Sequence, residues 1–343
     1  MDKDYILFKK IIIAVTIVTS ILLIGRILKE YEEKDLPYTK QIPVFDTYAK
    51  ITFYKKNEQN HEIATEIFKL LRHLHKIANI YDNKSEISHL NQTASQKPFK
   101  CSETLWKIIL AAQNAYKHTN GYFDISCTPI MKLWGFHRKR KTLPSEKEKK
   151  EVLKFIGFDK IILDKEKHTV FFSVKGMSLD MGGLVKGYAL QEALKILKKY
   201  NITYAMLDFG GNIACPKTPP PGKDTFTIGI KHPIDQTRLL TQIPLLNRTI
   251  STSGNYERYV TIDNKQYSHI MNPINATPIQ NAISVSVLTP SSINSDILST
   301  AIFAGAPNLI IDNFPDTDIL IIKMNDKKLS YRTIGKIWGK IEL

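Results

Sequence analysis

The mixture of amphipathic helices with a stretch of short β-like segments is the feature that most limits the possible folds. Residues 61–81 and 102–118 place apolar side chains at i, i+3, i+4 and i+7, the spacing of one buried helix face. Between residues 204 and 288 the chain instead runs through short β-like segments. This order does not fit repeated β-α-β crossovers. We therefore expect an α+β fold with mostly antiparallel sheets flanked by helices.

Four more segments outline the rest of this domain. Residues 44–56 alternate apolar and polar side chains like a strand, and we place the start of the folded domain there. Helices are expected near residues 184–200 and 294–305, and the densely charged stretch 137–154 is expected to be a solvated loop that leads into a short helix. With 343 residues, 43% of them hydrophobic, the chain can bury a sizeable core.

An apolar run precedes the domain. Residues 11–25 carry no charged side chain, and the run extends to Leu28 if the Arg26 side chain reaches toward lipid head groups. A helix over residues 11–28 would span about 27 Å, enough to cross a thin bilayer. We expect one N-terminal transmembrane helix here, and a cleaved signal peptide is the alternative.

The charges around this run indicate its orientation. Three lysines precede it, which favours a cytoplasmic N-terminus and export of the remaining chain. We therefore expect residues 1–28 to be a cytoplasmic stub and anchor, residues 29–43 a polar linker, and residues 44–343 the folded domain. The domain that follows the anchor would then lie on the outer side of the membrane.

The net charge of the chain is strongly positive. Lys and Arg number 48 against 33 Asp and Glu, which gives +15 and favours anionic partners such as nucleotides, nucleic acid or phospholipid. The basic residues are scattered and form no nucleic-acid reader motif, so we expect no nucleic-acid partner. The three cysteines have the spacing of neither a zinc site nor a disulfide framework.

The segment SLDMGGLVKG, residues 178–187, combines features that suit an anion. Asp180 is followed by two glycines, which expose backbone N–H groups, and Lys186 is expected in the first turn of the next helix. Phosphate would be favoured there, and Asp180 could accept hydrogen bonds from a ribose or a heterocycle. The alternative is a plain strand-turn-helix connection.

The segment SDILST, residues 295–300, has the composition of a magnesium site. Asp296 and Thr300 are four residues apart, which places them on one face of a helix. One carboxylate and one hydroxyl suit Mg²⁺, which completes its coordination with water and substrate phosphates. The alternative is that Ser295 or Asp296 only caps the helix.

Two further segments contain candidate reactive groups. His269, in YSHIMNP, could be the base that removes a proton from an attacking hydroxyl, or it could be structural. Thr252, in ISTSGNYERY, could lie beside phosphates, or its segment could simply form a hairpin turn.

Taken together and in order, eight segments resemble the ApbE family of FAD:protein FMN transferases. The resemblance extends over about residues 44–323 and predicts an ApbE-like fold. The segments are FDTYAKITFY, NKSEISHLN, GYFDISCTPIMKLWGF, SLDMGGLVKGYA, MLDFGGNI, STSGNYERY, SHIMNP and SDILSTAIFAGAP.

The resemblance implies a magnesium-dependent enzyme that cleaves FAD and transfers FMN to a Ser or Thr hydroxyl of a target protein, releasing AMP. It also implies that residues 44–343 are the catalytic domain and that the acceptors are exported domains of membrane redox complexes of the Rnf and Nqr type. The location implied is the bacterial inner membrane, with the catalytic domain on the periplasmic or outer side. Two alternatives remain open: an FAD pyrophosphatase that yields FMN and AMP, and a noncatalytic flavin-binding protein.

The resemblance also implies roles for individual residues. His269 corresponds to the base. The expected metal ligands are the Gly183 carbonyl, Asp296, Ser299 and Thr300. The expected flavin contacts are Phe45, Tyr81, Tyr122, Phe123, Asp124, Asp180, Lys186, Thr252, His269 and Ile270.

The chain departs from the family pattern at four positions. Phe45 stands where many members have Met, and stacking could replace that contact. Asn272 replaces an Asp and Ala276 replaces a Gly in the turn after His269. Ser299 replaces an Asp found in some members, which predicts weaker metal binding.

Overall fold

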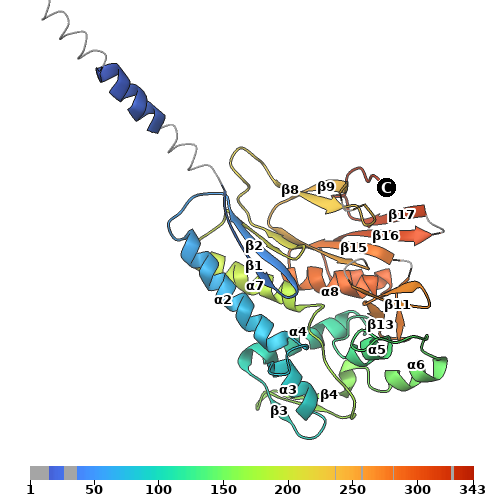
Figure 1. The fold of residues 1–343 in the computed structure, drawn as a ribbon. Helices are drawn as coiled ribbons and strands as arrows, with labels where there is room; N and C mark the ends of the chain where they lie inside the picture. The colour runs from blue at the N-terminus through green and yellow to red at the C-terminus, as the bar shows by residue number, and fades with distance from the viewer. Residues whose placement is uncertain (1–14, 27–36, 236, 256–257, 281, 326–327) are drawn as a thin grey trace, which may run out of the picture.

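The computed structural model describes residues 15–26, 37–235, 237–255, 258–280, 282–325 and 328–343. A helix over residues 15–26 projects away from the folded domain (Figure 1). Within the described part of the chain, no helix has both the length and the apolar character needed to cross a membrane. The predicted anchor covers residues 11–28, so its two ends lie outside the described residues.

One large sheet organises the described part of the domain. Its strand order is β1-β2-β6-β7-β10-β15-β16-β17, and every neighbouring pair is antiparallel. The α+β class with antiparallel pairing is therefore confirmed. The strands are β1 (Tyr38–Val44), β2 (Thr47–Phe53), β6 (Ala205–Phe209), β7 (Asn212–Cys215), β10 (Arg248–Gly254), β15 (Ala282–Thr289), β16 (Asp318–Asn325) and β17 (Lys328–Ile334).

The first strand begins earlier than the sequence predicts. β1 pairs along its whole length with β2, so the sheet starts at Tyr38, within the predicted linker and before Val44. Phe45 and Asp46 separate the two strands and adopt φ angles of +55° and +57°. Two residues with positive φ form the tight turn that suits a hairpin. Because this turn contains no glycine, the stretch resembles one continuous strand in the sequence.

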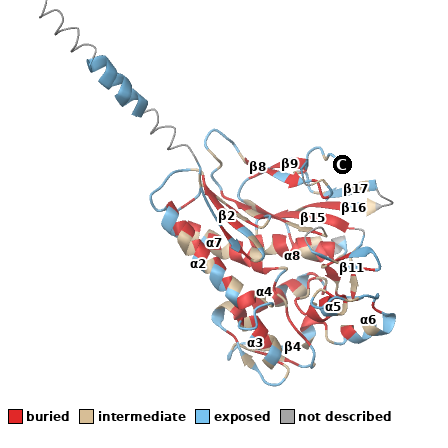
Figure 2. Ribbon diagram, viewed as in Figure 1, coloured by how far each residue is buried: buried red, intermediate tan, exposed pale blue. Residues whose placement is uncertain are grey.

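The two faces of the sheet have different coverings. Three helices pack on one face: α2 (Asn60–Ala78), α7 (Val185–Lys199) and α8 (Ser292–Phe303) (Figure 1). A hairpin of β8 (Phe226–Lys231) and β9 (Leu239–Leu245) packs on the other face. Neighbouring residues of a strand therefore point into separate cores: in β15, Val287 belongs to the core on the helix side and Leu288 to the core under the hairpin. Figure 2 shows buried segments on the helices that cover the sheet.

A smaller helical part lies beside this layered unit (Figure 1). It includes a three-stranded sheet and two short hairpins. Its elements are α3 (Glu86–Thr93), β3 (Phe99–Lys100), α4 (Glu103–His118), α5 (Thr128–Leu133), α6 (Glu146–Leu153), η1 (Phe158–Lys160), β4 (Ile161–Asp164), β5 (Thr169–Phe172), β11 (Tyr259–Ile262), β12 (Lys265–Ser268), β13 (Met271–Asn272), β14 (Thr277–Pro278) and η2 (Asn308–Asn313).

The predicted helices follow their apolar periodicity. In α2, Ile63, Ile67, Leu71 and Leu74 are fully buried, and the helix ends three residues before the predicted end at Tyr81. In α4, α7 and α8 the boundaries lie within two residues of the prediction. The charged stretch forms a loop that leads into α6, as predicted.

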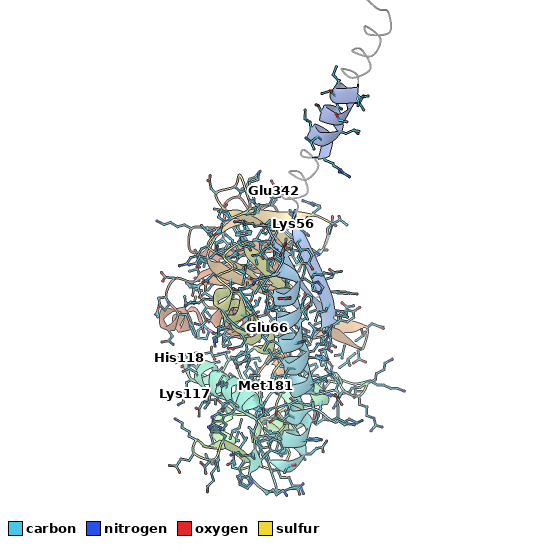
Figure 3. The ribbon with its side chains drawn as sticks, turned by 90° about the vertical axis from the view of Figure 1, so that its left-hand side faces the viewer. Lys56, Glu66, Lys117, His118, Met181 and Glu342 are labelled. Carbon is cyan, nitrogen blue, oxygen red and sulfur yellow. The ribbon has the colours of Figure 1, made fainter. Side chains whose placement is uncertain are left out.

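Polar contacts join the helices to one another. Glu66 of α2, labelled in Figure 3, accepts hydrogen bonds from the Tyr200 hydroxyl (2.6 Å) and the Lys199 ammonium (3.0 Å). These bonds link the middle of α2 to the C-terminal end of α7. The N-terminal end of α7 contacts α8, where Gly187 allows a close approach: a Cβ there would lie 2.5 Å from the Ser292 carbonyl oxygen.

Replacement of Gly187 by Ala is expected to destabilise the protein. Gly→Ala inside a helix usually stabilises, because glycine lowers helix propensity by about 1 kcal/mol. Here the new methyl group would also lie 2.7 Å from the Asp296 Cβ, so α7 and α8 must separate. We expect a loss of about 1–3 kcal/mol in the free energy of unfolding, measured by urea denaturation. Lys195→Ala, on the exposed side of α7, is the control and should change it by less than about 0.5 kcal/mol.

Candidate active site

A cavity of about 610 Å³ opens where the large sheet meets the helical part. This volume lies in the range of small-molecule and cofactor sites. The cavity is lined by every predicted flavin contact and by three of the four predicted metal ligands. These residues are Phe45, Tyr81, Tyr122, Phe123, Asp124, Asp180, Gly183, Lys186, Thr252, His269, Ile270, Asp296 and Thr300. Ser299 is buried and does not line the cavity.

The glycine turn before α7 brings Asp180 and Lys186 to this cavity. The Asp180 N–H donates to the Ile125 carbonyl (2.8 Å), and the Asp180 carboxylate accepts from the Gly182 N–H (2.8 Å). Burial raises the pKa of Asp180, while the charge of Arg258 opposes this shift. Lys186 lies in the first turn of α7, as predicted, and adds positive charge to the cavity wall.

Asp296 is a buried carboxylate inside α8. The N-cap of this helix is Ser291, whose side chain accepts from the Asn294 N–H (3.3 Å), so the alternative that Ser295 or Asp296 caps the helix is wrong. Only 4% of Asp296 is exposed, and its Oδ2 accepts from the Gly187 N–H (2.8 Å). Burial raises its pKa, and the nearby charge of Lys186 opposes this.

A row of hydroxyl pairs fixes α8 on β10 and so positions Asp296. Three residues of the strand, two apart, each contact one residue on the buried side of the helix. The Oγ–Oγ pairs are Thr249–Ser292 (3.0 Å), Ser251–Ser295 (2.8 Å) and Ser253–Ser299 (3.0 Å). Ser299 reaches the cavity wall through Ser253 and also donates to the Asp296 carbonyl (3.0 Å).

The oxygen atoms around Asp296 are of the kind that could hold a hard cation such as Mg²⁺. The carboxylate is buried and, among the described residues, belongs to no ion pair, so a cation would compensate its charge. Thr300 supplies a hydroxyl on the same helix face. Gly183 lies close to Thr300, because a Cβ there would be 3.4 Å from Thr300 Cγ2. Both residues line the cavity together with Asp296. Carboxylate, hydroxyl and carbonyl oxygens are the ligands that hard cations prefer.

His269 is held in one orientation beside the cavity. Its Nδ1 lies 3.1 Å from the Arg258 carbonyl oxygen, which also accepts from the His269 backbone N–H (3.2 Å). Because a carbonyl only accepts, Nδ1 carries the hydrogen and Nε2 keeps a free lone pair. Burial lowers the pKa of His269 to about 4, and the charges of Arg258 and Lys186 act in the same direction. The side chain is therefore neutral near pH 7, as a base must be.

Part of the cavity wall is aromatic. Phe45, in the β1–β2 turn, contacts His75 edge to face, with 5.7 Å between the ring centroids. Asp124 accepts from the N–H (2.8 Å) and the hydroxyl (2.7 Å) of Ser126, which orients its carboxylate. Burial raises the pKa of Asp124 to about 6 despite these bonds.

The sequence did not single out four residues that also shape this cavity region. The Arg258 guanidinium lies 5.3 Å from the centre of the Tyr81 ring and 3.5 Å from Asp46 Oδ2. The His137 ring stacks on Tyr81, with 5.7 Å between centroids. Arg258 lies in the segment STSGNYERY and Asp46 lies in FDTYAKITFY, next to Phe45. Their membership of these two segments was the sequence feature that could have identified them as site residues.

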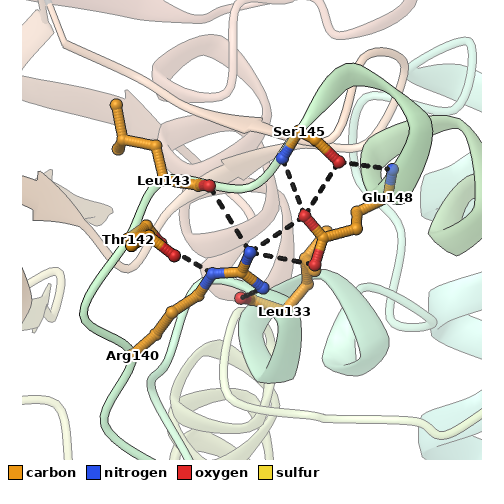
Figure 4. A network of polar contacts seen from close by, with 6 residues as sticks. All are labelled: Leu133, Arg140, Thr142, Leu143, Ser145 and Glu148. Carbon is orange, nitrogen blue, oxygen red and sulfur yellow. Dashed lines mark hydrogen bonds and ion pairs between the residues drawn. The ribbon is translucent and has the colours of Figure 1, made fainter.

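The fourth of these residues, Arg140, fixes the loop that carries His137 (Figure 4). Its guanidinium bonds both carboxylate oxygens of Glu148 (2.9 Å each) and the Thr142 carbonyl (2.7 Å). Glu148 in turn forms a capping box with Ser145 at the start of α6. The loop is thus anchored, which holds His137 against Tyr81.

The fold and cavity describe a class: α+β proteins with a ligand-sized cavity that is lined by basic side chains and by a buried carboxylate. The ApbE family model matches residues 45–312. This chain belongs to the ApbE family.

Relatives with a named activity cover most of the chain. The FAD:protein FMN transferase of Haemophilus influenzae is 29% identical over 255 residues, which are 72% of this chain and 72% of that protein. The transferase of Klebsiella pneumoniae is 28% identical over 70% of this chain and 75% of the relative. The transferase of Treponema pallidum is 26% identical over 83% of this chain and 84% of the relative.

Solved structures have the same fold. The ApbE protein of Thermotoga maritima has a TM-score of 0.76 and 26% identity, over 84% of this chain and 94% of that structure. The flavin transferase ApbE of Vibrio cholerae has a TM-score of 0.74 and 24% identity, over 87% of this chain and 97% of that structure.

Proposed function

We propose that this protein is an FAD:protein FMN transferase that attaches FMN to a Ser or Thr hydroxyl of an acceptor protein through a phosphodiester bond. The observation that carries the proposal is the placement of a neutral, oriented His269 in one cavity with Lys186 and the buried Asp296. These are the groups that such a transfer needs: a base for the hydroxyl and positive charge beside a pyrophosphate.

The chemistry follows from these positions. His269 Nε2 takes the proton of the acceptor hydroxyl as its oxygen attacks the phosphorus of the FMN half. The new P–O bond replaces the bond to the bridging oxygen, which leaves with AMP. Lys186 lies on the cavity wall where it stabilises negative charge on the phosphates. The Arg258 carbonyl keeps His269 in the required tautomer throughout.

We propose that Asp296, Thr300, Ser299 and the Gly183 carbonyl hold Mg²⁺. When bound, the ion withdraws charge from the pyrophosphate and so helps the leaving group. Ser299 contributes less than the others, because its hydroxyl already bonds Ser253 and the Asp296 carbonyl.

The transferase is tested by incubating the protein with FAD, Mg²⁺ and an exported domain of a membrane redox complex. We expect the intact mass of the acceptor to rise by one FMN, less one water, with an equal amount of AMP released. Free FMN and AMP without labelled acceptor would instead support the pyrophosphatase, and FAD that stays intact while bound would support a noncatalytic flavin-binding protein. His269→Ala is the control: it should remove labelling but retain FAD binding, since a base acts on the transition state.

Asp296→Asn is expected to raise the Mg²⁺ concentration required for turnover by at least tenfold. The substitution keeps the shape and an oxygen for the Gly187 N–H but removes the charge that a cation needs. The measurement is a Mg²⁺ titration of AMP release at saturating FAD. Asp164→Asn makes the same change on β4, outside the cavity, and should leave the titration unchanged. An Asp296→Asn curve that superimposes on that of the wild type would contradict the metal site.

We propose that residues 11–28 anchor the protein in the bacterial inner membrane, so that the domain faces the outer side and reaches exported acceptors. The uncharged apolar run and the preceding lysines support this. After carbonate extraction of membranes, the full-length chain should remain in the pellet. Recovery of a chain shortened near residue 30 in the soluble fraction would instead indicate a cleaved signal peptide.

A further inference from the structure

Asp46 and Arg258 lie at the mouth of the cavity. Both line it, yet their side chains are 64% and 49% exposed, so they mark the place where the cavity meets solvent. Asp46 belongs to the turn between β1 and β2, and Arg258 directly precedes β11. These hairpins are in separate sheets. The ion pair between Asp46 and Arg258 therefore links two units across the cavity mouth.

Arg258 and Asp46 are each held in place by neighbouring residues. The Arg258 guanidinium rests near the Tyr81 ring, which itself stacks on His137. Arg258 is also fixed through its backbone, because its carbonyl accepts the hydrogen bonds of His269. Asp46 is fixed by the strained two-residue turn that it shares with Phe45. Each side chain is thus positioned by contacts on its own side of the cavity mouth.

The ion pair between Asp46 and Arg258 is weak enough to open and close. Its nitrogen and oxygen are 3.5 Å apart and partly solvated, and exposed pairs of this kind contribute about 0–1 kcal/mol. A ligand entering the cavity can therefore separate the partners at little cost.

We propose that Asp46 and Arg258 form a clasp that closes over bound FAD, slows its escape and limits the access of water to the phosphorus. This inference rests on the proposed transferase function and assigns two positioning residues to it. Attack by the acceptor hydroxyl would then be favoured over hydrolysis, because the closed pair narrows the opening on the side where His269 lies until an acceptor displaces it.

The test compares Asp46→Asn and Arg258→Gln in the full-length protein. FAD dissociation is followed by flavin fluorescence in EDTA, where no turnover is required. A clasp needs both partners, so each substitution should speed dissociation about two- to fivefold, and the double variant should be no faster than the single variants. In the complete reaction, both variants should release more free FMN per labelled acceptor than the wild type.

The alternative is that Arg258 acts alone by attracting phosphate. Asp46→Asn would then slow dissociation, since it frees Arg258 from a competing carboxylate, while Arg258→Gln would speed it. Opposite directions, or rates equal to that of the wild type in both variants, would overturn the clasp. Lys107→Gln and Glu103→Gln, which break an exposed pair on α4 outside the cavity, are the matched controls and should not change the rate. A wild-type protein that binds no FAD would overturn the proposed function and, with it, the clasp.

Discussion

The buried carboxylate of Asp296 depends on an unusually close contact between two helices. Gly187 lets α7 approach α8 until its own N–H reaches the carboxylate, and the hydroxyl pairs between β10 and α8 hold the helix from the other side. Hydroxyl groups buried in pairs specify a register that an apolar contact would leave looser, because each unpaired partner would carry a desolvation cost. Several buried polar contacts thus serve to position one charged group, the Asp296 carboxylate.

The electrostatics of the cavity follow from that placement. Lys186 and Arg258 supply positive charge, whereas His269 stays neutral because burial disfavours its charged form. Because His269 is neutral, its Nε2 can accept a proton from a hydroxyl. The negative charge of the phosphates is then left to the two cations. The overall charge of +15 is a weaker indicator, since it describes attraction to anions in general and not this arrangement.

The sequence predicted the helices because apolar periodicity is a local pattern, and it predicted part of the cavity lining through local motifs and the family resemblance. Apolar periodicity defines α2 and α4, and the glycine turn places Asp180 and Lys186 by chain connectivity alone. The contact between Asp46 and Arg258 was not predictable in this way. These residues are 212 positions apart, and they meet only after the sheet has assembled and the hairpins have docked.

In the turn after His269, tertiary and local contacts support two residues that differ from the family pattern, Asn272 and Ala276. Ala276 adopts φ = +56°, the conformation that glycine would take more easily, and its carbonyl accepts from the Trp134 indole (2.8 Å). Asn272 Oδ1 accepts from the Ile274 N–H (2.8 Å), a bond that an Asp would also make. The altered residues therefore retain the shape of the turn and lose only one negative charge. A turn distorted by these two substitutions would favour the noncatalytic alternative, whereas the ordered turn beside His269 favours an active enzyme.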